Sequence, residues 1–256
     1  MTAPSSPAQP PSAGRSHRNR NLLIGLIAVV VIGGVAVGGY GLYYLFLSPA
    51  GPAAVASGAP VIPSGAGVTA PASLDGTWNV NTSLGSISDF SASWVGYRVQ
   101  EQLAGVGANT AVGRTPLVTG SMSLTGAVVD NVSISADLTA LKSSDPNRDN
   151  QLRRQAIDTD QFPTATFKTT APIDLGTLPA EGKTVSVTAA GTLTIHGVTK
   201  NVSIALAAVR QGGIIAVTGT LPVVFGDYGF SGPSSFSVLS VDDHGIMELH
   251  LLFTHA

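Results

Sequence analysis

An acid and an imidazole lie two residues apart near the C-terminal end, in the stretch GIMELHLLF. Glu248 and His250 would share one face of an extended strand, because side chains alternate with a period of two, and His255 would fall on the opposite face. Such groups can bind a metal ion, but a metal site needs several converging ligands with supporting partners. The sequence offers only a pair. We therefore interpret Glu248 and His250 as polar residues at the surface or rim of the fold, and we expect no metal site.

Three arginines gather in RDNQLRRQAID, at positions Arg148, Arg153 and Arg154. They could form a cationic rim that binds a phosphate or carboxylate head group. The alternative, which we favour because aspartates are interleaved with them, is a solvated helix face with local ion pairs. Arg98 and Arg114 are two further candidates for a place at the mouth of a pocket.

No arrangement typical of an enzyme occurs in the chain. It lacks the Gly-x-Ser-x-Gly elbow, a phosphate-binding loop ending in Gly-Lys-Ser/Thr, and His-Glu-x-x-His. His196 lies in the turn pattern IHGVT, where a structural hydrogen bond is favoured over a polar contact at a barrel mouth. We therefore expect no enzymatic activity and no cofactor.

The distribution of charge argues against nucleic acid as a partner. All fifteen acidic residues lie at or after Asp75, together with ten of the thirteen basic ones, so this region has a net charge of −5. Nucleic-acid binding calls for a clustered basic face instead. The chain contains no cysteine, which excludes disulfides and thiol chemistry.

The N-terminal part of the chain predicts a single membrane anchor. Residues 22–47 contain no charge and exceed the roughly 20 apolar residues that cross a bilayer. Arg15, Arg18 and Arg20 precede this run and no basic residue follows before Arg98, so the positive-inside rule places the N-terminus in the cytoplasm. We expect a single-pass plasma-membrane protein with an extracytoplasmic C-terminal domain, although AAVAS leaves cleavage of the anchor open.

Two segments of low complexity flank this anchor. Residues 1–21 are rich in Pro, Ser, Ala and Arg and are expected to form a disordered cytoplasmic tail. Residues 48–74 are rich in Pro, Gly, Ala and Ser without any charge, which is typical of a flexible or semi-extended tether. The folded domain is expected to span residues 75–256.

That domain shows the alternation of a half-buried antiparallel sheet. The period of two recurs in SWVGYRVQE, DNVSISADLTAL, GTLTIHGVT, NVSIALAAV and HGIMELHLLF, with Gly, Asp, Asn and Pro between the runs. One helix of about three turns is expected to begin at Asp145-Pro146 and to stop at Phe162-Pro163. Its apolar stripe is thin, so it must lie on the end of a barrel as a plug or lid.

Three stretches of the chain resemble the YceI-like family of lipocalin-like proteins. They are NRDNQLRRQAIDTDQFPTATFKTT, GTLTIHGVTKNVSIAL and WVGYRVQEQLAGVGANTAVGRT, and together the resemblance covers nearly all of residues 75–256. One departure is LPVVFGDYGF, where many members carry a basic residue and Asp-Phe-Gly. The resemblance implies an all-β fold: an antiparallel lipocalin-like β-barrel of about eight strands with one short capping helix, here preceded by a transmembrane helix.

The resemblance also implies a ligand. Members bind amphiphilic molecules such as polyisoprenoids or fatty-acid derivatives, and we expect this chain to bind a polyisoprenoid, an isoprenoid quinone or a fatty-acid derivative inside the barrel. The alternatives are a barrel-fold isomerase or esterase acting on an apolar substrate, and a structural or stress-response module with a filled core. The sequence leaves open whether the protein forms a homodimer. The residues expected to contact the ligand are Val95, Tyr97, Val99, Leu152, Phe162, Phe167, Leu193, Ile195 and Ile204.

Overall fold

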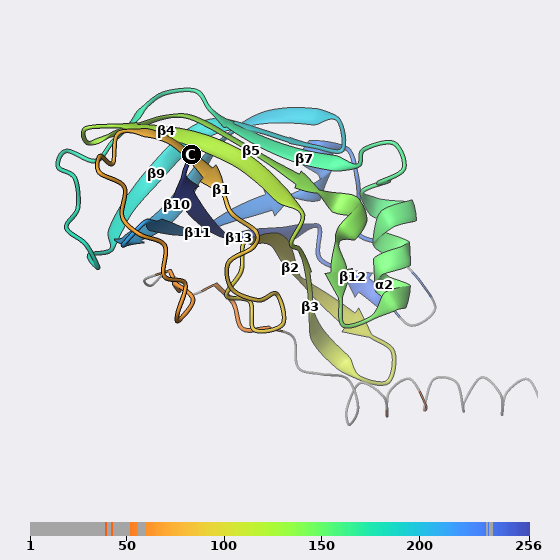
Figure 1. Ribbon diagram of the computed structural model, residues 1–256. Coiled ribbons are helices and arrows are strands. Elements are labelled where there is room, and N and C mark those ends of the chain that lie inside the picture. The colour runs from red at the N-terminus through yellow and green to blue at the C-terminus, as the bar shows by residue number, and fades with distance from the viewer. Residues whose placement is uncertain (1–38, 40–41, 43–51, 56–59, 234, 236–237) are drawn as a thin grey trace, which may run out of the picture. The chain divides into compact units, whose positions relative to one another are not determined.

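The computed structural model describes residues 39, 42, 52–55, 60–233, 235 and 238–256 (Figure 1). The chain divides into two compact units, Met1–Leu47 and Ser48–Ala256, and the description below concerns the second. The expected tail and anchor, residues 1–21 and 22–47, lie outside the described residues except for Gly39 and Leu42. Within the described part of the chain, no helix combines the length and apolarity needed to cross a bilayer.

Eight antiparallel strands close into a barrel. Their order is β1-β4-β5-β7-β9-β10-β11-β13, and β1 also pairs with β13, which completes the ring. This arrangement confirms the all-β, eight-stranded antiparallel barrel that the alternation and the resemblance predict. The bounds are β1 Gly76–Val80, β4 Val118–Thr125, β5 Val128–Asp137, β7 Thr164–Thr169, β9 Val185–Ile195, β10 Val198–Gln211, β11 Ile214–Val224 and β13 His244–His255.

The long strand β13 divides its pairing between two partners. Its C-terminal residues pair with β1, whereas Ile246–His250 pair with β2 (Trp94–Leu103), which leaves the barrel as the first strand of a branch. The branch continues through β3 (Gly107–Thr115) to the short strand β6 (Lys142–Ser143), and β12 (Val238–Val241) pairs with β2. A further short strand, β8 (Ile173–Asp174), pairs with β5.

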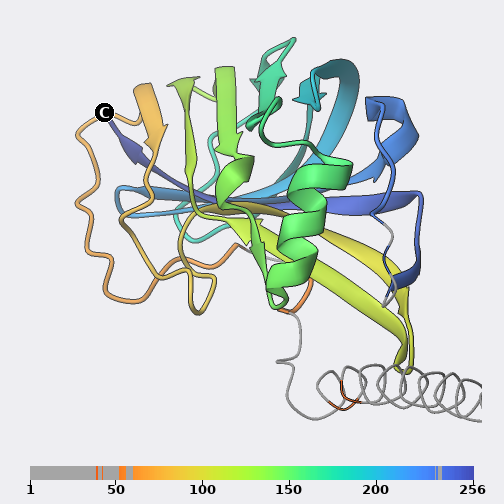
Figure 2. The same ribbon diagram turned by 90° about the vertical axis from the view of Figure 1, so that its right-hand side faces the viewer.

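One short helical segment lies at the end of the barrel where this branch departs (Figures 1 and 2). Helix α2 (Pro146–Gln151) continues into the π-helical turn η3 (Leu152–Ala156). The side chain of Asp145 accepts a hydrogen bond from the Asn147 backbone N–H at 2.8 Å, so the predicted N-cap is confirmed. Two 3₁₀ turns, η2 (Leu138–Ala140) and η4 (Phe225–Tyr228), are the other helical elements among the described residues of the second unit.

The thin apolar stripe of this helical segment packs against residues outside the segment. Ala156 and Ile157 form a buried cluster with Leu138, and Leu152 packs against it. A stripe so narrow cannot form a core of its own, so its stability comes from contact with the end of the sheet.

The described parts of the Pro/Gly/Ala-rich segment contact the outside of the barrel. We call residues 52–55 and 60–68 the strap. Ile62, Ala66 and Val68 pack against a buried cluster of outward-facing residues from β10, β11 and β13, and the Gly213 backbone N–H donates to the Val68 carbonyl at 2.9 Å. The uncharged composition predicts a flexible or semi-extended tether; in the structure these residues instead cover apolar side chains of the barrel wall.

Candidate ligand-binding cavity

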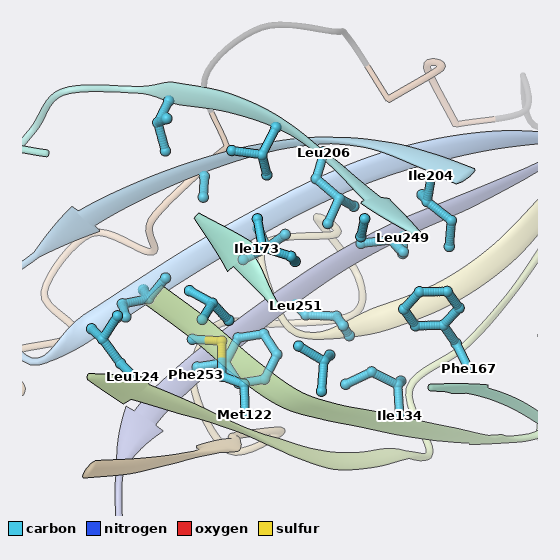
Figure 3. A pocket seen from close by; sticks show the side chains of 18 of the residues that line it. Met122, Leu124, Ile134, Phe167, Ile173, Ile204, Leu206, Leu249, Leu251 and Phe253 are labelled. Carbon is cyan, nitrogen blue, oxygen red and sulfur yellow. The ribbon is translucent and has the colours of Figure 1, made fainter. Parts of the chain in front are cut away.

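The barrel encloses an apolar cavity that its own side chains do not fill (Figure 3). The cavity volume is about 160 Å³. A single buried water needs only about 10–15 Å³ of such volume. The lining includes Met122, Leu124, Ile134, Phe167, Ile173, Ile204, Leu206, Leu249, Leu251 and Phe253.

Strand alternation directs these side chains inward. On β13 the odd-numbered residues from Met247 to Phe253 line the cavity, while the even-numbered residues face outward. On β5 the alternation changes phase, because both Val129 and Val132 line the cavity. Asn131 lies between them with a φ of 52°, and the β4–β5 register shifts at this place. This bulge keeps apolar side chains directed inward on both sides of the shift.

A glycine lets an aromatic ring lie against the wall. A Cβ at Gly191 would come within 2.6 Å of the Phe167 ring and 2.3 Å of the Lys168 carbonyl oxygen. Phe167 therefore lies directly over the β9 backbone and lines the cavity instead of crossing it.

Four of the nine residues expected to contact the ligand line this cavity. They are Val95, Phe167, Leu193 and Ile204, from four different strands. The barrel thus brings together residues that are far apart in the sequence. Their contact with a ligand stays a prediction.

The other five expected residues lie outside the cavity lining. Tyr97 and Val99 continue the inward face of β2 past Val95, and the Tyr97 ring lies over Gly113. The Tyr97 hydroxyl is buried without a hydrogen-bond partner among the described residues, and burial raises the pKa of this phenol well above its ordinary value. These two residues extend the inner face toward the helical end of the barrel.

The remaining three pack near that helical end. Leu152 belongs to the stripe of the helical segment, and Ile195 packs against the cluster that contains Leu193 and Ile204. Phe162 meets His196 edge to face, with ring centroids 4.4 Å apart. His196 Nδ1 lies 3.1 Å from the Tyr228 carbonyl oxygen, so the favoured structural hydrogen bond of this histidine is confirmed.

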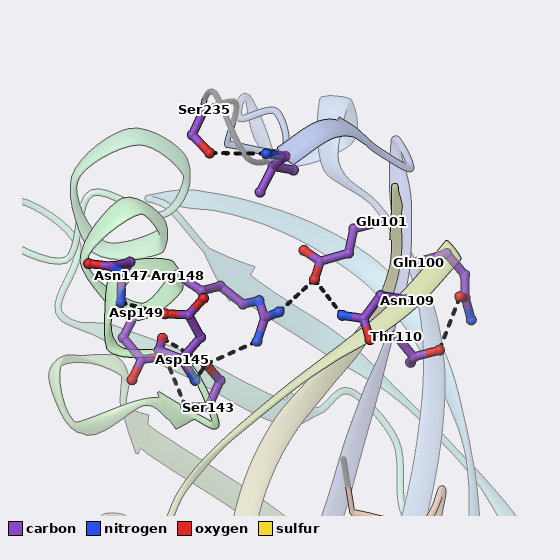
Figure 4. Close-up of polar contacts among 11 residues, drawn as sticks. Gln100, Glu101, Asn109, Thr110, Ser143, Asp145, Asn147, Arg148, Asp149 and Ser235 are labelled. Carbon is purple, nitrogen blue, oxygen red and sulfur yellow. Dashed lines mark hydrogen bonds and ion pairs between the residues drawn. The ribbon is translucent and has the colours of Figure 1, made fainter. Parts of the chain in front are cut away.

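A buried polar cluster holds helix α2 against strand β2 (Figure 4). Arg148 donates through Nη2 to Glu101 Oε1 at 2.5 Å, and Asn109 Nδ2 donates to the same oxygen at 2.6 Å. Ser143 Oγ donates to Asp149 Oδ1 at 2.7 Å within the same cluster. The interpretation of Arg148 as part of a solvated helix face is wrong, because this residue is 8% exposed and ion-paired with a strand.

The sequence contained a signal for this cluster. Glu101 falls on the same alternation as Val95, Tyr97 and Val99, the face expected to be buried. A carboxylate on a buried face needs a paired cation, and Arg148 is the residue that provides it.

A second buried charge cluster lies on the outer face of β13, beneath the strap. Glu248 is 1% exposed and accepts hydrogen bonds from Arg98 Nε at 3.2 Å and Arg114 Nη2 at 3.4 Å. The Val55 backbone N–H also donates to it, at 3.0 Å. The arginines donate in turn to strap carbonyls, Arg98 to Pro52 and Arg114 to Ala53. Neither arginine therefore stands among the residues that line the cavity.

Aromatic neighbours complete the burial of this cluster. The Arg114 guanidinium carbon lies 3.7 Å from the Trp94 ring centroid and 4.1 Å from that of Phe90. Burial lowers the pKa of Arg114, although the nearby Glu248 carboxylate opposes this effect. Guanidinium pKa values are high enough that the group stays charged.

His250 lies beside this cluster, stacked on Trp94. Its Nδ1 is 2.9 Å from the Ala92 carbonyl oxygen and its Nε2 is 2.9 Å from that of Val61 in the strap. His250 is 3% exposed. The interpretation of Glu248 and His250 as surface or rim residues is therefore wrong, because the strap covers them. Among the described residues, no three His, Asp or Glu side chains converge as a metal site would require.

An eight-stranded antiparallel barrel around an apolar cavity, closed near one end by a short helix, defines a lipocalin-like class of protein. The family model of the YceI-like domain matches residues 78–253, which is more than half of the chain. The chain therefore belongs to the YceI-like family, as the three sequence stretches indicate.

Solved structures from three bacteria resemble the barrel. A polyisoprenoid-binding domain from Saccharophagus degradans, implicated in plant cell wall breakdown, has a TM-score of 0.54 and 16% identity over 70% of this chain and 98% of that one. BcnA of Burkholderia cenocepacia has a TM-score of 0.48 and 22% identity over 62% and 95%. The YceI protein of Campylobacter jejuni has a TM-score of 0.47 and 15% identity over 56% and 84%. No curated protein matches the chain.

Proposed function

We propose that this protein binds an amphiphilic molecule with a long apolar chain, such as a polyisoprenoid, an isoprenoid quinone or a fatty-acid derivative, and carries it without chemical change. The observation on which the proposal rests is the unfilled barrel interior, whose lining is apolar apart from Thr166, Lys183 and Arg210. The polyisoprenoid-binding domain of S. degradans, which shares the fold, supports this choice of ligand class.

Burial of the apolar chain would supply the favourable free energy of binding. Each methylene removed from water contributes about 0.8 kcal/mol, so roughly a dozen buried carbons supply about 10 kcal/mol before the costs of association. An apolar wall supplies this free energy without hydrogen bonds, and it accepts chains of differing chemistry as long as they fit.

Leu193→Asp tests this function through lipid that copurifies with the protein. Leu193 lines the cavity and is 2% exposed, so an aspartate there places a charge on the apolar wall. We expect mass spectrometry of extracts to detect stoichiometric lipid with the wild-type chain and a loss of at least tenfold with the variant. Thr188→Asp is the matched control, because Thr188 is an exposed residue of the same strand, and it should retain the lipid.

A second variant separates loss of binding from loss of folding. Ala189 also lines the cavity, and Ala189→Phe fills space without adding charge. We expect this variant to unfold cooperatively and to yield less lipid. A wild-type chain that carries no stoichiometric lipid, or folded Leu193→Asp and Ala189→Phe variants that keep it, would contradict the proposed function.

We also propose that the barrel lies outside the plasma membrane, anchored by residues 22–47 with the N-terminus in the cytoplasm. The uncharged run and the arginines that precede it support this orientation.

The absence of cysteine makes the orientation testable by labelling in intact cells. A membrane-impermeant maleimide should label Thr177→Cys, an exposed position of the barrel unit, and should label Ser12→Cys only after the cells are opened. The opposite pattern would show the reverse orientation, and labelling of neither variant in intact cells would place the barrel inside.

A further inference from the structure

Two cations, Arg210 and Lys183, lie at the lip of the apolar cavity. Arg210 follows Ile204, Leu206 and Ala208 as the last inward-facing residue of β10, and Lys183 continues the inward alternation of β9 just before that strand begins. The ladder between β9 and β10 ends at the Ala208–Val185 pair, just before these two residues. The Gly182 backbone N–H donates to the Arg210 carbonyl at 2.8 Å, which holds the two strand ends together.

This arrangement leaves the cations incompletely neutralised. Arg210 Nη1 forms a long ion pair with Glu181 Oε2 at 3.7 Å, beyond hydrogen-bond distance, and Arg210 Nε is buried without a hydrogen-bond partner among the described residues. The Glu181 side chain is 53% exposed, and its other oxygen accepts the Gly212 backbone N–H. Two like charges at the same lip of the cavity repel each other, so an anion bound beside them would be stabilised.

We infer that Arg210, assisted by Lys183, binds the anionic head group of the amphiphile whose chain occupies the cavity. This inference rests on the proposed function and narrows the ligand to molecules that end in a carboxylate or a phosphate. Arg210 has both requirements of a head-group ligand: a planar guanidinium suited to two oxygens of an oxyanion, and a position at the junction of apolar wall and solvent. Exposed Leu178 and half-buried Pro179 line the same lip and provide apolar surface beside the head group.

Three probes with chains of equal length test the head group. Hexadecyl phosphate, palmitate and hexadecanol differ only at the polar end. Each can be titrated against the full-length protein, which is kept soluble by an amphipol and immobilised on beads. We expect Arg210→Gln to weaken the binding of hexadecyl phosphate about tenfold, since charge-assisted hydrogen bonds are lost, and to change the binding of hexadecanol less than twofold. If Arg210→Gln weakens the binding of palmitate by the same factor, either a carboxylate or a phosphate serves as the head group. If it weakens only the binding of hexadecyl phosphate, the head group is a phosphate.

Controls separate this inference from the proposed function. Arg154→Gln removes an exposed arginine of the helical segment and should leave all three affinities unchanged, and circular dichroism checks that each variant is folded. Two results together would overturn the head-group inference but not the proposed function. In the first, hexadecanol binds the wild type but not Leu193→Asp; in the second, Arg210→Gln changes the affinity for all three probes equally. Failure of every probe to bind the wild type would overturn the proposed function and this inference with it.

Discussion

Glu248→Gln is expected to destabilise the barrel unit by about 3 kcal/mol, the lower end of the range for removing one partner of a buried ion pair. The substitution preserves the shape of the side chain but removes the charge that neutralises Arg98 and Arg114, whose side chains are 18% and 5% exposed. Arg114 then stays buried, and Arg98 half-buried, without this counterion. Chemical denaturation measures the loss, and the exposed Asp160→Asn is the control that should change stability by less than about 0.5 kcal/mol.

The same variant should also release the strap. Glu248 accepts the Val55 N–H directly, and the two arginines that it positions bind the Pro52 and Ala53 carbonyl oxygens. Hydrogen exchange at Val55 should therefore accelerate in Glu248→Gln, while amides within the β9–β10 pair keep their protection. Unchanged exchange at Val55, or a stability equal to the wild type, would show that the cluster does not hold the strap.

The fold was predictable because its signals are local. Alternation between apolar and polar residues defines the strands over runs such as Val132–Leu138, and Asp145-Pro146 marks the helix start through the geometry of its cap. A sheet with one apolar face and no second layer of helices must close or stack. These arguments need only neighbouring residues, and the structure confirms them.

The burial of Glu248 and His250 was not predictable by the same means. Glu248 and His250 alternate with apolar residues, as solvent-facing residues of a strand do. Nothing in their strand indicates that the strap covers them, because the strap residues that they contact lie 193 and 189 positions earlier in the sequence. The strap itself is uncharged and rich in Pro and Gly, which resembles a free tether. Its role depends on its backbone carbonyls, which composition does not reveal.

The cavity lining was predictable only in part. Residues of a regular strand, such as Leu193 and Ile204, follow from the alternation. The bulge at Asn131 reverses the inward–outward alternation within β5. The cations Lys183 and Arg210 line the cavity because the inward alternation of β9 and β10 continues to the ends of these strands. Tyr97 and Val99 lie on the predicted face but beyond the cavity, since β2 leaves the barrel for the branch sheet. Alternation indicates the face of a strand but not how far a cavity extends along it.

Removing either partner of the Glu101–Arg148 pair is expected to cost about 3–5 kcal/mol, because each change leaves the other charge in a buried site. Glu101 is 5% exposed and Arg148 is 8% exposed. The double variant Glu101→Leu/Arg148→Leu should be less destabilised than the sum of the two single variants, since either single change already removes the interaction between these two side chains. Urea denaturation of the wild type, both single variants and the double variant gives the coupling energy directly.

This cycle also tests how the helical end of the barrel is held. Leu152, Ala156 and Ile157 bury too little surface to hold the helical segment alone, so the ion pair should determine whether α2 remains docked on β2. We expect faster hydrogen exchange in residues 146–156 of both single variants, with little change in the β9–β10 pair. Arg154→Leu, which changes an exposed residue of the same segment, should alter neither stability nor exchange. Additive effects of the two single variants would mean that Glu101 and Arg148 act independently and that their ion pair does not hold the helical segment.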